Sequence, residues 1–284
     1  MSRIRTIITP ALTTAVLHEY LVMCKSAACV GRELGLSSTE VLNIVRRNGY
    51  LPRSHSVSHK KYSMDVSFFE SIDTEAKAYV LGLLFADGSI SGKNGRVSLV
   101  LQEGDGPLLH QINSLIQNTC PIRYTTRTTP SGNVKMYARL SFHDRKVAAD
   151  LSKYGLIPNK TYGMQLPVLS PELYRHFIRG FWDGDGNIYL GKQTKQWRPV
   201  SVAATSNTIF CEQLRDIIET QIGIHFSVRK AHSDNEKISQ LSLSNVRGVR
   251  SFLDFIYKDA HVYLQRKYNK YQDIVRWQDT RGGV

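Results

Sequence analysis

Two long stretches of the chain show the same succession of apolar patterns. An apolar helix is predicted in "TEAKAYVLGLLFADG" (74–88) and in "SPELYRHFIRGFWDGDG" (170–186), and each stops at an acidic turn that contains glycine. A strand pair, an amphipathic helix, a second strand pair and a further helix follow each of them. The order α-β-β-α-β-β-α therefore occurs twice, about 100 residues apart, which predicts a duplicated α+β fold with pseudo-twofold symmetry.

The strands of both copies alternate between apolar and polar residues. "RVSLVLQ" (96–102) and "PVSVAAT" (199–205) are the clearest strands, and "VKMYARLSF" (134–142) alternates over its whole length. This pattern predicts antiparallel sheets with one face buried and the other exposed. The exposed positions are rich in cations, hydroxyls and amides, as a surface in the DNA major groove requires, although a solvated face is the ordinary alternative. The expected DNA-binding residues are Arg96, Ser98, Arg123, Thr125, Arg127, Lys135, Tyr137, Arg139, Lys192, Gln193, Lys195, Arg198, Ser201, Arg229, Gln240 and Ser242. Which of them contact bases and which contact phosphates is open.

The N-terminal part of the chain has a different pattern. "KSAACVGRELGLSSTEVLNIVRRNGY" (25–50) predicts two helices joined by a sharp turn at Gly35, with Ser37 or Ser38 capping the second helix. This pattern is typical of a helix-turn-helix, whose second helix enters the major groove. An ordinary helical hairpin is the alternative. The residues expected to face DNA are Ser38, Thr39, Asn43, Arg46 and Arg47.

These patterns divide the chain into four segments. We expect a helix-turn-helix module at 1–55, a basic linker at 56–67, a first repeat at 68–165 and a second repeat at 166–284. The fold class is therefore α+β, with tandem αββαββα repeats preceded by a small all-α module.

Composition narrows the choice of partner. Hydrophobic residues make up 42% of the chain, enough for packed cores, and the formal net charge of +13 favours a polyanionic partner. No apolar run is long enough to span a membrane, and no long amphipathic basic helix stands out. The four scattered cysteines and the absence of a secretory signal predict reduced, buried thiols in an intracellular protein. We expect the cytoplasm of a bacterium or of a phage-infected cell, with an organelle as the alternative.

The acidic turns carry the candidate chemistry. Gly82 and Ala86 on the helix before the first turn, and Gly180 and Gly184 on the helix before the second, place small residues four apart on one face of each helix. Small residues at this spacing let two helices approach closely, which would bring Asp87 and Asp185 side by side. Two carboxylates at helix C-termini repel each other and need cations. Mg²⁺ suits such a pair, and two acids that hold metal over a phosphodiester can support its hydrolysis.

Two other interpretations of the acidic turn are open at this point. Asp183, Asp185 and Asn187 have the spacing of a calcium loop, but Ile188 and Thr194 occupy the positions where such a loop needs Gly and Glu. An acidic turn without chemistry is the plainer alternative, because Asp-Gly commonly follows a helix.

The stretches "VLGLLFADG" (80–88) and "IRGFWDGDG" (178–186) resemble the LAGLIDADG motif of homing endonucleases, and the repeat resembles the single-chain members of that family. The resemblance implies that Asp87 and Asp185 bind Mg²⁺, with Mn²⁺ or Ca²⁺ able to replace it in binding, and that the carbonyls of Ala86 and Gly184 assist. It also implies catalytic lysines after the last helix of each repeat and a Gln at the end of the second strand. The matching residues are Lys160, Lys267 (with Arg266 or Lys270 as alternatives) and Gln102, with Thr205 in the place comparable to Gln102. Asp183 lies on a different helix face and is not expected to be catalytic.

The resemblance implies a monomeric endonuclease, of a kind often encoded in introns, that cuts double-stranded DNA at a long asymmetric site and leaves 3′ overhangs. Whether an intron encodes this protein is open. The alternatives are a non-cleaving DNA-binding regulator and an RNA maturase that binds its own intron RNA. An intein is not expected, because the sequence begins with Met and ends "TRGGV". A membrane partner is not expected either.

Overall fold

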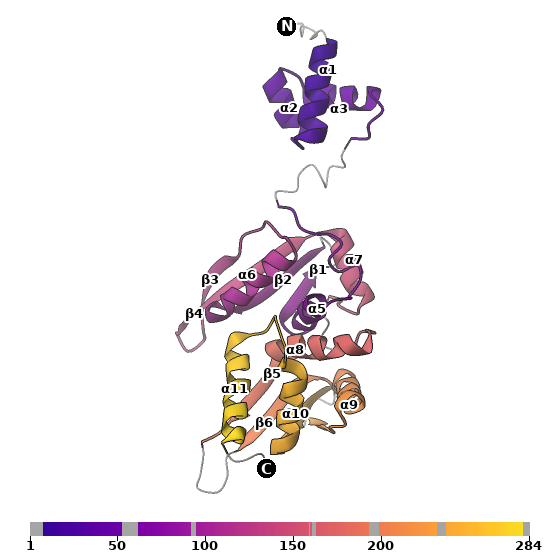
Figure 1. Cartoon of the computed structure of the whole chain (residues 1–284). Coiled ribbons are helices and arrows are strands. Elements are labelled where there is room, and N and C mark those ends of the chain that lie inside the picture. The colour runs from indigo at the N-terminus through magenta and orange to yellow at the C-terminus, as the bar shows by residue number, and fades with distance from the viewer. Residues whose placement is uncertain are drawn as a thin grey trace. The chain divides into compact units, whose positions relative to one another are not determined.

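The computed structural model describes residues 8–52, 62–91, 95–158, 160, 163–192, 199–231 and 237–280. The chain forms two compact units, Met1–Tyr62 and Ser63–Val284, and each has its own hydrophobic core (Figure 1). No helix in these described ranges has the length and apolar character needed to cross a membrane. Of the four cysteines, which are all free, only Cys211 is buried, so the expectation of buried thiols is wrong for the other three.

The first unit is helical. Helix α1 (Pro10–Leu17) runs into a π-helical turn, and α2 (Ala27–Leu34) and α3 (Ser38–Arg47) follow. Gly35 ends α2 with a φ of +70°, a left-handed conformation that glycine adopts without strain. Ser37 begins α3 with a capping box that Glu40 completes. The two predicted helices are confirmed, with Ser37 as the cap, whereas the sequence pattern did not predict α1.

The second unit contains the two predicted repeats. The first consists of α5 (Glu75–Asp87), β1 (Gly88–Ser91), β2 (Arg96–Gln102), α6 (Gly106–Leu115), β3 (Arg123–Thr128), β4 (Val134–His143) and α7 (Arg145–Lys153). The second consists of α8 (Tyr174–Asp185), β5 (Gly186–Leu190), β6 (Val200–Asn207), α9 (Thr208–Ile222), β7 (Ser227–Lys230), β8 (Ile238–Leu243) and α10 (Val246–Tyr257). The antiparallel sheets have the orders β1-β2-β4-β3 and β5-β6-β8-β7, which confirms the duplicated α+β fold. The C-terminal helix α11 (Gln265–Asp279) is an addition that the repeat pattern did not predict.

Helices α5 and α8 pack against each other, and each leads into the sheet of its own repeat (Figure 1). The contact is close because glycines face backbone. A Cβ on Gly82 would lie 2.0 Å from the carbonyl oxygen of Phe177, and a Cβ on Gly180 would lie 2.0 Å from that of Tyr79. No side chain fits at either position. The prediction that small residues bring these helices together is therefore confirmed.

Candidate active site and nucleic-acid interface

The packing of α5 on α8 places two carboxylates at neighbouring helix ends. Asp87 is the last residue of α5 and Asp185 the last of α8. A Cβ on Gly184 would lie 3.0 Å from Asp87 Oδ2, so the side chain of Asp87 lies directly against the turn that carries Asp185. Gly184 leaves room for this approach because it has no side chain.

The environment makes both carboxylates costly to ionise. Although each residue as a whole is exposed, the packed helix ends withhold water from the carboxyl groups. This partial burial, and next the negative charge of Asp87, raise the pKa of Asp185 to about 6. Burial also raises the pKa of Asp87, although the charges of Lys267 and Lys160 oppose the rise. A cation bound between the carboxylates would relieve this cost.

Each helix end also carries one lysine, at equivalent positions in the two repeats. Lys160 Nζ donates hydrogen bonds to the carbonyl oxygens of Leu84 and, at 2.9 Å, of Ala86 in the last turn of α5. Lys267, which is 4% exposed, donates to the equivalent oxygens of Trp182 at 2.6 Å and Gly184 at 3.2 Å. Carbonyls at a helix C-terminus lack partners in their own helix and carry partial negative charge, so an ammonium group stabilises them.

The geometry distinguishes Lys267 from the two alternatives considered for it. Arg266 pairs with Asp105 at 3.1 Å, and Lys270 donates to the carbonyl of Ile188. Only Lys267 matches Lys160 in its contacts. Burial lowers the pKa of both lysines to about 8, and the charges of Asp87 and Asp185 oppose this lowering.

These lysine contacts bear on the carbonyls of Ala86 and Gly184, which were expected to help hold the metal. In the structure both oxygens accept hydrogen bonds from an ammonium group. A metal at the same oxygen would lie beside a positive charge, which Coulomb repulsion disfavours. The carboxylates of Asp87 and Asp185 are the remaining protein donors.

Two carboxylates suit Mg²⁺ better than they suit a metal that takes all of its ligands from the protein. Among the described residues, no three His, Cys, Asp or Glu side chains gather into a metal-binding group. Mg²⁺ keeps several waters and is commonly held by one or two carboxylates together with phosphate oxygens. The pair Asp87 and Asp185 fits that pattern.

Asp183 has a role that excludes the calcium interpretation. Its side chain is fully buried and accepts hydrogen bonds from Tyr79 Oη at 2.8 Å, Tyr257 Oη at 2.5 Å and the amide of Leu264 at 2.7 Å. The carboxylate points into the core, away from any loop that could collect calcium ligands. Burial raises its pKa, opposed by these hydrogen bonds. That Asp183 is not catalytic stays a prediction.

Gln102 is the exposed last residue of β2. Because β1 begins directly after Asp87 and runs antiparallel to β2, Gln102 lies at the same end of the sheet as the start of β1. The comparison with Thr205 is wrong. Gly88 pairs with Leu99 in the first repeat, and Gly186 pairs with Ala204 in the second. The residue of the second repeat that is equivalent to Gln102 is therefore Asn207, not Thr205. Asn207 is 4% exposed and caps α9, so its side chain is committed to the fold.

The polar side chains of the first sheet share one face. Strand pairing sets Arg123, Thr125 and Arg127 of β3 opposite Arg139, Tyr137 and Lys135 of β4. It also sets Arg96 and Ser98 of β2 opposite His143 and Ser141. Side chains of Val97, Leu99 and Leu101 point to the other, buried face. Ser98 is the exception to an accessible surface, because it is 7% exposed and its hydroxyl lies 3.1 Å from that of Ser89.

The second sheet has a face of different character. Ser201, Gln240, Ser242 and Arg229 lie on it by register, together with exposed Tyr189. Lys192 is exposed beyond the end of β5, whereas Gln193, Lys195 and Arg198 lie outside the described residues. Among the described positions of this face, hydroxyls and amides outnumber cations.

In the first unit, the five residues expected to face DNA are all exposed on α3. Val41, Ile44 and Val45 pack on the opposite side of this helix. Arg46 donates to Asn43 at 3.2 Å. The helix therefore presents a polar, basic face, as a recognition helix requires.

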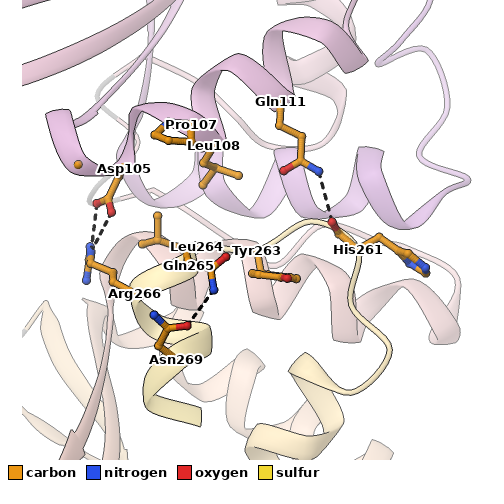
Figure 2. Close-up of a pocket in the computed structure, with 11 residues that line it drawn as sticks. Asp105, Pro107, Leu108, Gln111, His261, Tyr263, Leu264, Gln265, Arg266 and Asn269 are labelled. Carbon is orange, nitrogen blue, oxygen red and sulfur yellow. Dashed lines mark hydrogen bonds and ion pairs between the residues drawn. The ribbon is translucent and has the colours of Figure 1, made fainter. Parts of the chain in front are cut away.

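The sequence patterns did not predict the polar contacts between the repeats. Figure 2 shows a cleft between α6 and the segment 261–269, across which Arg266 reaches Asp105 and Gln111 donates to the carbonyl of His261. The adjacent position of Arg266 and Lys267 was the only local signal. The partners lie more than 100 residues away in sequence, so periodicity could not reveal them.

Comparisons with known proteins agree with this architecture. Residues 172–257 match the family model of the LAGLIDADG-like domain. The structure of the homing endonuclease I-WcaI bound to its DNA recognition sequence is similar over 80% of this chain and 96% of that chain, with 13% identity and a TM-score of 0.50. The structure of the meganuclease I-SmaMI bound to uncleavable DNA is similar over 75% and 93%, with 15% identity and a TM-score of 0.50. A comparison with curated proteins gives no match. The resemblance is thus confirmed at the level of the fold: residues 172–257 match the LAGLIDADG-like domain, and the chain shares the LAGLIDADG fold of these solved structures.

Proposed function

We propose that this protein is a metal-dependent endonuclease that cuts both strands of DNA at one long asymmetric site. The observation that carries the proposal is the pair Asp87 and Asp185, side by side at the ends of two packed helices, each with a lysine on its helix end. Two carboxylates whose pKa values are raised in this way gain most from a divalent cation, and a cation held there could in turn bind the oxygens of a phosphodiester.

The residues of the site divide the work. Asp87 and Asp185 hold Mg²⁺, which when bound polarises a phosphodiester and helps to activate water. Lys160 and Lys267 keep positive charge beside the acids and thereby favour the ionised carboxylates. Gln102, at the exposed end of β2, orients water near Asp87. The product carries short 3′ overhangs.

The sheets and the first unit supply the binding surface. Cations on the first sheet, such as Arg123 and Arg139, neutralise phosphates or bind guanine edges. The amides and hydroxyls of the second sheet, such as Gln240 and Ser242, contact base edges. Helix α3 adds major-groove contacts that lengthen the site. I-WcaI and I-SmaMI, which share the fold, are both bound to DNA in their structures. We propose that the protein is monomeric and intron-encoded, as the family pattern suggests.

The test is a selection of cleaved molecules from a randomised double-stranded DNA library with Mg²⁺. We expect one long, asymmetric sequence to be enriched among the cut molecules, and its enrichment to disappear with EDTA. Enrichment of a bound sequence that is never cut, under Mg²⁺, Mn²⁺ or any other divalent metal, would contradict the proposal. That result would support a DNA-binding regulator, whereas retention of intron RNA in preference to DNA would support a maturase.

A further inference from the structure

Asp183 is tied to three separate elements of the second unit. Tyr79 of α5, Tyr257 at the end of α10 and the amide of Leu264 all donate hydrogen bonds to its carboxylate. A carboxylate has two acceptor oxygens and can accept all three bonds. An amide side chain has one oxygen and would turn its NH2 group toward at least one of the three donors. The residue therefore holds these elements together through its two oxygens.

Arg179, one helical turn earlier on α8, binds the same segment. Its guanidinium is fully buried and donates to the carbonyls of Ile256 and Val262, both at 2.9 Å, and to the carboxylate of Glu75 at 2.6 Å. Residues 256–264, which we term the strap, are thus held against α8 at both ends. An ion pair whose guanidinium is buried and bonded to two carbonyls fixes geometry more than it adds stability.

The strap leads directly to Lys267. Leu264 is the residue before α11, and the amide of Lys267 donates to the Leu264 carbonyl. No side chain caps this helix start, so the bond from the Leu264 amide to Asp183 fixes where α11 begins. The ammonium of Lys267 then returns to the carbonyls of Trp182, Asp183 and Gly184. Both Leu264, at the end of the strap, and Lys267, three residues later, are therefore hydrogen-bonded to α8.

Within the described residues, the first repeat has no counterpart of this network. Leu81 and Phe85 occupy the positions equivalent to Arg179 and Asp183, and both are buried among apolar residues. Lys160 donates to two carbonyls, whereas Lys267 donates to four. The two lysines are therefore held by different means, although they occupy equivalent places.

We propose that Asp183 is a positioning residue for Lys267: by anchoring the amide of Leu264 it places the lysine of the second repeat, and with it one of the two strand-cutting sites. This inference deepens the proposed function and depends on it for its kinetic test. It assigns a task to an acid of the motif that neither binds metal nor contacts substrate.

The first test needs neither metal nor DNA. Hydrogen–deuterium exchange is measured on the full chain for wild type, Asp183→Asn and Leu214→Ala, a control that opens a cavity at a buried position of α9. We expect the amides of residues 260–268 to exchange faster in Asp183→Asn and to be unchanged in Leu214→Ala. If Asp183→Asn does not fold, Tyr257→Phe removes one of the three bonds and should show a smaller increase in the same peptides. Wild-type exchange across this segment in the folded variants would overturn the proposal.

The second test separates positioning from a general loss of stability. Cleavage of a supercoiled plasmid that carries the selected target is followed for the nicked intermediate. We expect Asp183→Asn to slow cutting of one strand by on the order of 10- to 100-fold, so that nicked circles accumulate. Leu214→Ala should slow both cuts alike, if at all. Equal slowing of both strands by Asp183→Asn would contradict positioning. If the wild type does not cut, the proposed function fails, and the exchange experiment still decides the placement of Lys267.

Discussion

At the scale of single residues, the two acids of the candidate site destabilise the folded, metal-free protein. Asp87 and Asp185 end two helices at the negative poles of their dipoles, and each raises the energy of the other. The pKa of Asp185 is raised from its ordinary 3.8 to about 6. At neutral pH the ionised carboxylate therefore destabilises the folded state. Such groups are common at functional sites and rare elsewhere.

Removal of this charge should therefore stabilise the metal-free protein. Between pH 4 and 6 the folded state binds more protons at Asp185 than the unfolded state does, so the free energy of unfolding falls as pH rises. We expect Asp185→Asn to raise the free energy of unfolding by about 1 kcal/mol at pH 8, after allowance for solvent screening, and the midpoint Tm by about 2–4 °C. The gain should vanish toward pH 4.

Thermal denaturation of both proteins at pH 4.5 and pH 8, with EDTA or with Mg²⁺, measures this effect. Mg²⁺ should raise the Tm of the wild type more than that of the variant, because the variant lacks one metal ligand. A variant that is less stable than the wild type at pH 8 in EDTA would show that Asp185 supports the fold rather than burdening it.

At the scale of elements, the contact between α5 and α8 determines where both acids lie. Gly82 and Gly180 allow the backbones to touch, and the glycine at 184 leaves room for Asp87. Because the helices touch over these positions, a change of one methyl group has to be absorbed by backbone rather than by a flexible side chain.

Gly180→Ala should therefore separate the helices. The added Cβ would lie 2.0 Å from the carbonyl oxygen of Tyr79, so we expect a loss of about 3 kcal/mol in the free energy of unfolding, equivalent to about 6–12 °C in Tm. Gly104→Ala is the matched control, because a Cβ at that position meets nothing within 4 Å. Chemical denaturation measures both changes. Equal stability of the two variants would mean that α5 and α8 are not packed as closely as described.

The same elements show how far sequence alone could predict the structure. The alternating strand β2 and the continuously apolar helix α5 were predicted within one or two residues, because their patterns are local. The close approach of the helices followed from the small residues on one face of each. Helix α11 was missed because its polar residues obscure its apolar stripe. The bonds of Lys267 and Asp183 join segments about 80 residues apart, and no local pattern encodes them.

At the scale of the whole molecule, charge is distributed unevenly over the candidate DNA surfaces. The described polar face of the first sheet carries five cations, and that of the second carries hydroxyls and amides with Arg229. The first unit adds exposed cations on α3, namely Arg46 and Arg47. Phosphate contacts increase affinity and its dependence on salt, whereas base contacts determine sequence.

Deletion of residues 1–62 tests the contribution of the first unit. The second unit has its own core, so the truncated protein should fold and should retain the cleavage chemistry. We expect weaker binding of the selected target and a shallower slope of log affinity against log salt, by about one for each phosphate that the first unit neutralises. Fluorescence anisotropy at several salt concentrations measures both. Unchanged affinity and slope would show that α3 does not bind this DNA.

The pairing of Asp87 with Asp185 over one substrate is the centre of the account, and a parallel measurement of binding and cleavage tests it most directly. Wild type, Asp87→Asn and Asp185→Asn are compared on the selected target, with binding measured in Ca²⁺ and cleavage in Mg²⁺. We predict that the variants bind the target within about tenfold of the wild-type affinity, because sheet contacts dominate binding, and that their cleavage falls by at least about 1,000-fold. Cleavage of the target by either variant at a rate near that of the wild type would contradict the account.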